Sequence, residues 1–212
     1  MSATPTSEDT ERICYAIYAQ TKTHQEDLVL NIGKAYKIPA VALRYFNIFG
    51  PRQSLSNPYT GVGAIFMSRL KNGKRPVIYE DGKQSRDFIS VHDIVQANML
   101  AMENPNGDYQ AFNVGSGKAT SIEQIALTLS NILGVEHLTP EIVENYREGD
   151  TRHSIADISH IKDTLGFKPN VTFENGMEEL VEWAREEDAV DGFAKAQAEL
   201  QQRGLTAKLD TE

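Results

Sequence analysis

Residues 17–46, IYAQTKTHQEDLVLNIGKAYKIPAVALRYF, decide the fold because they place a helix directly before a short apolar strand. Over residues 13–36 apolar side chains recur every three to four positions, which is the period of an amphipathic helix. Pro39 ends that helical pattern. The run at 40–46 is short and apolar, as in a strand buried on both faces. A helix followed at once by such a strand predicts a parallel sheet and an α/β fold.

Downstream of this unit, helical and strand patterns alternate at short intervals. Ser121 is a suitable N-cap for a helix that stops at Gly134. Asp81-Gly82 predicts a turn between two strands. These patterns together predict a smaller α+β domain. Its expected helices cover 62–72, 92–103, 122–133, 158–165 and 174–187, and its expected strands lie near 77–79, 88–91, 112–114 and 141–144.

The composition narrows the classes of protein to consider. The chain has 212 residues, a net charge of −9 and 40% hydrophobic residues, so it is expected to fold and not to bind nucleic acid or an anionic membrane. Cys14 is its single cysteine, which excludes an internal disulfide. No apolar run approaches a membrane span, and the polar N-terminus is unlike a signal peptide. We therefore expect a cytoplasmic protein, and the spacing of the histidines predicts no metal site.

Tyr18-x-x-x-Lys22 is the first candidate for chemistry. A spacing of four places both side chains on one face of a helix. A neighbouring ammonium favours the phenolate, which would let Tyr18 act as a general base on a sugar hydroxyl. The spacing alone is weak evidence, since Tyr79-x-x-x-Lys83 also fits it across a glycine turn.

The order of several short motifs resembles a known family over about residues 15–185. The motifs are Arg44-Tyr45-Phe46-Asn47, Gly50-Pro51-Arg52, Ser85-Arg86-Asp87-Phe88, Val91-His92-Asp93, Asn113-Val114-Gly115 and Arg147-Glu148-Gly149-Asp150. Together with Tyr18 they are similar to the NAD-dependent nucleotide-sugar epimerases and dehydratases of the extended short-chain dehydrogenase family. Within that family the chain looks most like UDP-N-acetylglucosamine and UDP-glucose 4-epimerases.

The resemblance assigns one group of residues to the cofactor and the sugar. It implies that Tyr18 is the base and that Lys22 assists Tyr18 and holds the nicotinamide ribose of NAD. It also assigns Tyr45 to the cofactor, and Phe46 and Asn47 to the substrate.

A second group is assigned to the UDP part and to the sugar substituent. Tyr79 resembles the aromatic residue beside the uracil, Arg86 and Arg147 the arginines that clamp the diphosphate, and Asp150 a contact to the ribose. Paired arginines match two phosphates, and a flat base suits an aromatic face. The alternative for each arginine is a salt bridge with the next acidic residue. In the family that the chain resembles, the residue at the Ser154 position helps to set the space beside the C2 group of the sugar. The resemblance therefore implies that the small Ser154 leaves room for an N-acetyl group, and that the substrate is an N-acetylhexosamine.

The NAD-binding fingerprint of the family is not found in this sequence. Gly61-Val62-Gly63 is its nearest match, without a third glycine or a preceding strand. The serine or threonine expected upstream of Tyr18 is also missing. We therefore expect the isolated chain neither to retain NAD nor to turn over a nucleotide sugar. The predicted organisation is a loose, polar lead-in at 1–14, a remnant of the Rossmann dinucleotide-binding domain at 15–60, a nucleotide-sugar domain at 61–187 and a polar tail at 188–212, whose Ala, Gln and Glu content permits a helix.

Three interpretations stay open on the sequence alone. The chain is the C-terminal half of a UDP-sugar 4-epimerase-like enzyme, an orphan nucleotide-sugar-binding module, or a non-catalytic, self-associating interaction protein. The strand at 40–46 is expected to lack the neighbour that the other half of the family's sheet supplies. An exposed edge of this kind predicts a homo-oligomer or a partner that carries the missing half.

Overall fold

The computed structural model describes residues 4–14, 16–57, 61–143, 145–147, 151–203 and 206–208, and it confirms the α/β fold. The chain divides into two compact units. Unit 1 comprises Met1–Ile48, Asp87–Ala119 and Ser154–Val171, and unit 2 comprises Phe49–Arg86, Thr120–His153 and Thr172–Glu212. Both units are discontinuous, whereas the domain limits predicted from the sequence are continuous.

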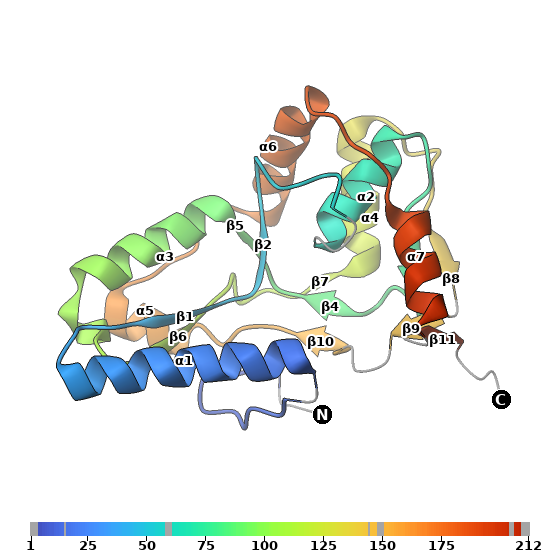
Figure 1. Cartoon of the computed structure of the whole chain (residues 1–212). Helices are drawn as coiled ribbons and strands as arrows, with labels where there is room; N and C mark the ends of the chain where they lie inside the picture. Colours follow the sequence, from blue (N-terminus) through green and yellow to red (C-terminus); the bar gives the residue numbers. More distant parts are fainter. Residues whose placement is uncertain are drawn as a thin grey trace. The chain divides into compact units, whose positions relative to one another are not determined.

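Unit 1 is built on parallel pairing between strands distant in sequence (Figure 1). Strand β1 (Ala42–Tyr45) runs parallel to β6 (Ala111–Val114), with Leu43 opposite Phe112. Strand β2 (Asn47–Phe49) pairs with β5 (Phe88–Ser90). The sequence analysis placed β5 and β6 in the second domain. In the structure both strands belong to unit 1, because their partners β2 and β1 directly follow the first helix.

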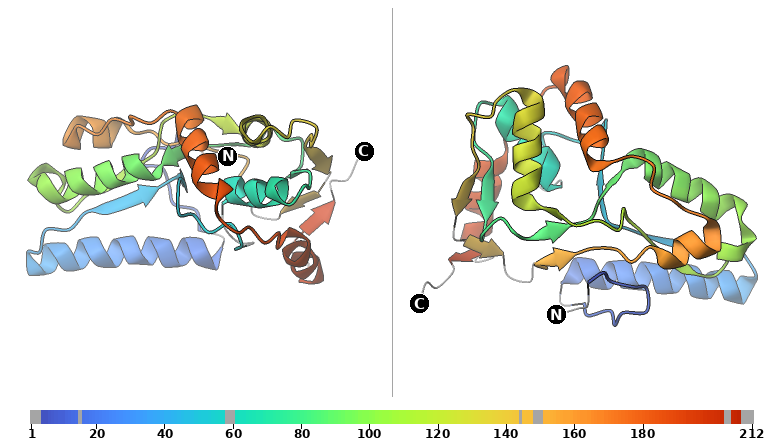
Figure 2. Two further views of the ribbon diagram at one scale, coloured as in Figure 1. Left: turned by 90° about the horizontal axis from the view of Figure 1, so that it is seen from above. Right: turned by 180° about the vertical axis from the view of Figure 1, so that it is seen from behind.

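Helices cover the β1–β6 pair of unit 1. Strand β1 lies between α1 (Ile17–Tyr36) and α3 (Val91–Glu103), as the left view of Figure 2 shows. The short helices η1 (Pro105–Gly107) and α5 (Ser159–Leu165) complete the unit. The core that they enclose consists of Ile89, Ile94, Ala97, Phe112, Val114, Ile161, Leu165 and Phe167.

Helix α1 contacts its own chain closely at one point. Gly33 is its buried residue, and a Cβ there would lie 2.8 Å from the Cβ of Ala40. The helix ends at Lys37, whose left-handed backbone (φ 57°) lets its N–H bond to the carbonyl of Gly33. The large hydrophobic side chains that α1 leaves exposed are Ile17, Tyr18, Leu28, Val29, Ile32 and Tyr36.

Unit 2 has a core of three helices, α2 (Val62–Lys71), α4 (Ile122–Leu133) and α6 (Phe173–Arg185). The predicted caps of α4 are confirmed. The hydroxyl of Ser121 accepts the N–H of Gln124, and Gly134 ends the helix with φ 71°. The fully buried side chains of this core include Phe66, Met67, Ile125, Leu129, Met177 and Leu180.

The strands of unit 2 are short and pair over long sequence distances. Strand β3 (Val77–Tyr79) is parallel to β8 (Glu141–Val143). The remaining strands are β4 (Ser85–Arg86) between β7 (Thr120–Ser121) and β10 (His153–Ser154), and β9 (Asn145–Arg147) beside β11 (Thr206–Lys208).

The turn at Asp81-Gly82 is present, but it does not join two paired strands. The two strands predicted on either side of it are both present, and they pair elsewhere, β3 with β8 and β5 with β2. Gly82 has φ 76°, which supplies the left-handed backbone that the turn requires.

The polar tail does contain a helix, α7 (Phe193–Gln202). The carboxylate of Asp191, just before it, accepts the N–H of Phe193 and pairs with Lys74 at 2.8 Å and Arg69 at 3.4 Å. Among the helices that the structure describes, none combines the length and the apolar character that a bilayer crossing requires.

Candidate functional site

Tyr18 and Lys22 lie on one face of α1, as their spacing predicted. The ammonium nitrogen of Lys22 is 5.6 Å from the centre of the Tyr18 ring. Tyr18 is 73% exposed. The pair is therefore open to a ligand from outside unit 1, and its role as a base and its helper stays a prediction.

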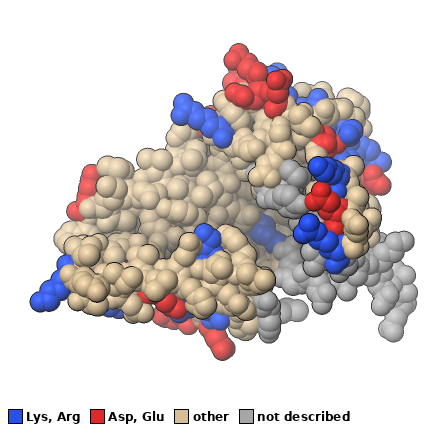
Figure 3. Space-filling model, in the orientation of Figure 1, with Lys and Arg blue, Asp and Glu red and all other residues tan. Residues whose placement is uncertain are grey.

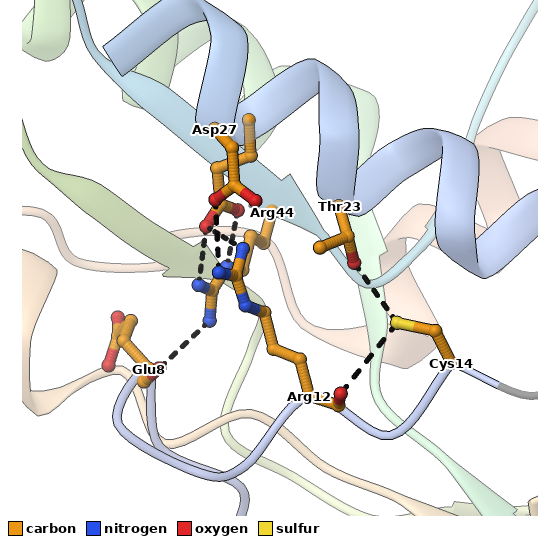
Figure 4. A network of polar contacts seen from close by, with 7 residues as sticks. Glu8, Arg12, Cys14, Thr23, Asp27 and Arg44 are labelled. Carbon is orange, nitrogen blue, oxygen red and sulfur yellow. Dashed lines mark hydrogen bonds and ion pairs between the residues drawn. The ribbon is translucent and has the colours of Figure 1, made fainter. Parts of the chain in front are cut away.

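An ionic network fixes α1 against β1 (Figure 4). Arg44 of β1 donates two hydrogen bonds of 2.7 Å to the carboxylate of Glu26, and this contact raises the pKa of the guanidinium above its ordinary value. Arg12 reaches Glu26 and Asp27 of the same helix at 3.0 Å. A bidentate arginine–carboxylate pair restrains orientation as well as distance. The network thus sets the position of the helix that carries Tyr18.

The N-terminal segment is not the loose lead-in that the sequence analysis expected. The N–H of Thr6 bonds to the carbonyl of Ile155, and its own carbonyl accepts the N–H of Asp157. The side chain of Glu8 accepts the backbone N–H of Asn113 at 2.7 Å. The expectation is wrong because this polar segment forms backbone hydrogen bonds with distant parts of unit 1, which its composition does not reveal.

Tyr45, Phe46 and Asn47 cross from β1 to β2. The Tyr45 hydroxyl donates to the side-chain oxygen of Asn98 at 2.9 Å. The backbone N–H of Phe46 bonds to Val114, and that of Asn47 to Asp87. The two strands thus order the backbone at all three candidate positions. The assignment of Tyr45 to the cofactor, and of Phe46 and Asn47 to the substrate, stays a prediction.

Asp87 organises unit 1, and the sequence analysis missed it. Its side chain is fully buried and accepts the N–H and the hydroxyl of Ser116, the N–H of Gly117 and the N–H of Ala156, at 2.6–3.1 Å. A Cβ on Gly115 would lie 2.5 Å from this carboxylate. An acidic residue directly before the apolar Phe88-Ile89 was the available signal, because a carboxylate buried beside such a strand requires donors. The sequence offered Arg86 as its partner, whereas the structure supplies mainly backbone N–H groups.

In unit 2, Tyr79 and Arg86 are both partly buried and held by backbone groups. The carbonyl of Tyr79 accepts the side-chain amide of Gln84 at 2.6 Å. The guanidinium of Arg86 donates to the carbonyls of Ser85 and Arg152 at 2.9 and 3.0 Å. These two carbonyl contacts restrain the orientation of the Arg86 guanidinium, and its role in binding phosphate stays a prediction.

The other predicted substrate residues are described less completely. The backbone of Arg147 lies opposite Thr206 in the β9–β11 pair. The side chain of Arg147 and the whole of Asp150 lie outside the described residues. Ser154, in unit 1, is partly buried, and its carbonyl accepts the N–H of Asp87.

Two further side-chain contacts of unit 2 were not predicted from the sequence. Arg152 donates to Glu80 at 2.9 Å and to Asp81 at 2.7 Å, and this contact lowers the pKa of the Asp81 carboxyl. The hydroxyl of Ser85 lies 2.8 Å from Nδ1 of His153. Within the described part of the chain, no three histidine, cysteine or acidic side chains are grouped to hold a metal ion.

Residues 2–115 match the NAD dependent epimerase/dehydratase family. A dTDP-L-rhamnose 4-epimerase from Burkholderia thailandensis is 38% identical over 175 residues, which cover 81% of this chain and 47% of that protein. The chain spans about half the length of the curated relatives that it matches.

Two solved structures share the fold at similar identity. The UDP-glucose 4-epimerase of Thermotoga maritima with UDP-glucose is 36% identical with a TM-score of 0.80, over 88% of this chain and 59% of that one. The UDP-N-acetylglucosamine 4-epimerase of Methanobrevibacter ruminantium M1, in complex with UDP-N-acetylmuramic acid, is 38% identical with a TM-score of 0.79, over 85% and 57%. The family that the motifs resembled is thus confirmed, and the chain belongs to the NAD-dependent epimerase/dehydratase family.

Proposed function

We propose that this chain is the nucleotide-sugar-binding half of a UDP-sugar 4-epimerase-like enzyme and does not turn over substrate alone. The observation that carries the proposal is the Tyr18–Lys22 pair, with its ammonium 5.6 Å from an exposed phenol ring. A phenol beside a fixed ammonium is suited to accepting a proton from a sugar hydroxyl. The solved relatives with UDP-glucose and with UDP-N-acetylmuramic acid support a UDP-sugar as the ligand.

Only part of an NAD site is present in this sequence. Tyr18 and Lys22 would hold the nicotinamide ribose, and NAD would supply the hydride acceptor that epimerisation requires. The glycine-rich turn that binds the pyrophosphate is missing from the 212 residues. We therefore assign NAD binding to a second polypeptide segment that completes the domain.

The exposed face of α1 and the free edge of β1 are the proposed docking surface for that segment. Among the described strands, β1 pairs with β6 alone, although a parallel strand is normally buried between two neighbours. Figure 3 shows a mainly uncharged surface at lower left, where α1 runs. The occupant is the NAD-binding half and not a second copy, because the chain spans about half the length of its relatives.

Calorimetric titration with UDP-N-acetylglucosamine tests the binding function. We expect saturable binding that Arg86→Gln weakens about tenfold, since it removes a charge-assisted contact to phosphate. Arg185→Gln is the matched control, because Arg185 forms an exposed pair with Glu182 elsewhere in unit 2. No binding of UDP-sugars by the wild-type chain, together with dimers in light scattering, would favour the self-associating interaction protein.

Turnover tests the enzymatic part of the proposal. The chain is expected to interconvert UDP-sugars only when fused to the NAD-binding half of a related epimerase. In that fusion Tyr18→Phe abolishes turnover and leaves UDP-sugar binding intact. Tyr36→Phe is the control, because Tyr36 is equally exposed on the same helix. Binding with no turnover in any such fusion would favour the orphan binding module.

The N-acetylhexosamine preference rests on the small side chain of Ser154. Ser154→Tyr fills the space that an N-acetyl group would need, so it should weaken binding of UDP-N-acetylglucosamine more than that of UDP-glucose. A wild-type chain that binds UDP-glucose more tightly than UDP-N-acetylglucosamine contradicts this preference.

A further inference from the structure

Arg152 connects the two segments of unit 2 that carry candidate ligand contacts. Its guanidinium donates to Glu80 at 2.9 Å and to Asp81 at 2.7 Å, in the turn that follows Tyr79. Its backbone carbonyl accepts a guanidinium N–H of Arg86 at 3.0 Å and the backbone N–H of Ser85 at 3.1 Å. One residue is therefore bonded to both segments.

The turn after Tyr79 needs this support because its backbone is unusual. Glu80 has φ 58°, a left-handed conformation that non-glycine residues adopt only when their surroundings impose it. Its N–H bonds to the carbonyl of Asn145, and its side chain is bonded to Arg152. Tyr79 is the last residue of β3, so the turn sets how this strand ends.

We propose that Arg152 is a positioning residue for a nucleoside diphosphate. Its side chain fixes the turn behind Tyr79, and its carbonyl group fixes the guanidinium of Arg86. The inference rests on the proposed function, in which Tyr79 faces the base and Arg86 faces the phosphates. Arg152 acts through these two residues and not by direct contact with the ligand, because both arms of its guanidinium are bonded to carboxylates.

Removing the carboxylates separates positioning from direct contact. The affinity for UDP is measured by calorimetry for the wild type, Arg152→Gln, the double variant Glu80→Gln/Asp81→Asn, and the triple variant that combines all three substitutions. If Arg152 is a positioning residue, the Arg152→Gln variant and the Glu80→Gln/Asp81→Asn double variant should each bind UDP about fivefold more weakly. This is the size of effect that a solvent-exposed ion-pair network supports. A positioning role also predicts that the triple variant is no weaker than either, because all three break the same bridge.

The opposite pattern would overturn the proposal. If Arg152 contacts phosphate directly, the Glu80→Gln/Asp81→Asn pair frees its guanidinium and leaves UDP affinity unchanged or higher. Arg185→Gln is again the control and should bind UDP like the wild type.

Hydrogen exchange gives a measurement that does not depend on ligand. Arg152→Gln should speed exchange of the Glu80 N–H, which bonds to Asn145, and leave Leu129 of α4 unchanged. Faster exchange with unchanged UDP affinity would overturn the positioning role alone. A wild-type chain that does not bind UDP at all would overturn the proposed function, and with it the ligand role of Arg152.

Discussion

Helices α1 and α6 have similar apolar spacing but opposite surroundings. In α6, Met177, Leu180 and Ala184 recur at three- to four-residue intervals and are all fully buried. In α1, Leu28, Ile32 and Tyr36 recur every four residues and are 59%, 49% and 74% exposed. An apolar stripe at helical spacing normally marks the face that a helix buries.

The difference teaches that the apolar stripe of α6 is buried within unit 2, whereas that of α1 stays exposed among the residues that the structure describes. Helix α6 packs on α4 in unit 2. Helix α1 is instead fixed by charge, through Glu26 and Arg44, and by the close approach of Gly33 to Ala40. Its apolar stripe is the surface on which we propose that an NAD-binding half docks.

The largest expected effect comes from truncating one leucine in each helix. Leu180→Ala leaves a cavity in a fully buried position and should lower the free energy of unfolding by about 2–5 kcal/mol. Leu28→Ala removes an exposed side chain and should change it by less than about 0.5 kcal/mol. Urea denaturation of the two variants measures both values. Equal losses would show that the stripe of α1 is covered in solution, for example by a second copy of the chain.

The next largest effect is expected at Asp87, which organises unit 1. Asp87→Asn keeps the side-chain shape but removes the charge that its buried donors face, so it should cost about 2 kcal/mol in the free energy of unfolding. Asp27→Asn, in an exposed pair with Arg12, is the matched control and should cost far less. A similar small loss in both variants would contradict an organising role for Asp87.

Sequence patterns predicted the helices well because their signals are local. Ser121 and Gly134 mark the ends of α4, and both are confirmed by cap hydrogen bonds. Strand partners were not predictable in this way. The turn at Asp81-Gly82 lies between two predicted strands, but it did not indicate their partners, which are β8 for β3 and β2 for β5. Strand pairing is decided by tertiary packing, which short windows of sequence do not contain.

The same limit applies to the candidate site. The shared face of Tyr18 and Lys22 followed from helical spacing, which is a local property. The donors around Asp87 come from residues 116, 117 and 156, so the sequence next to Asp87 could not predict them. The contact of Arg152 with the turn at Glu80 is equally distant in sequence. Residues that act through long-range contacts require the fold before they can be identified.

A smaller effect is expected at the point where α1 approaches its own chain. In Gly33→Ala the new methyl group meets the Cβ of Ala40 at 2.8 Å and the carbonyl of Ile38 at 2.9 Å. The steric cost exceeds the gain of about 1 kcal/mol in helix propensity, so a net loss of about 1 kcal/mol is expected. Thermal unfolding measures it, with exposed Lys34→Ala as the control. A more stable Gly33→Ala variant would mean that α1 does not approach Ile38 and Ala40 as closely as described.

The smallest effect concerns α7, which is anchored by charge in unit 2 as α1 is in unit 1. Burial alone would raise the pKa of Asp191, but Lys74, the N–H of Phe193 and Arg69 outweigh it and lower the pKa below the ordinary 3.8. A lowered folded-state pKa stabilises the protein above pH 3.8, and that contribution is lost as the pH falls through the folded value. Asp191→Asn should therefore be less stable than the wild type near neutral pH, by less than about 1 kcal/mol. Because other carboxyl groups titrate in both proteins, the difference between their unfolding free energies isolates Asp191. That difference should shrink towards zero in acid, and a constant difference would show that charge does not anchor α7.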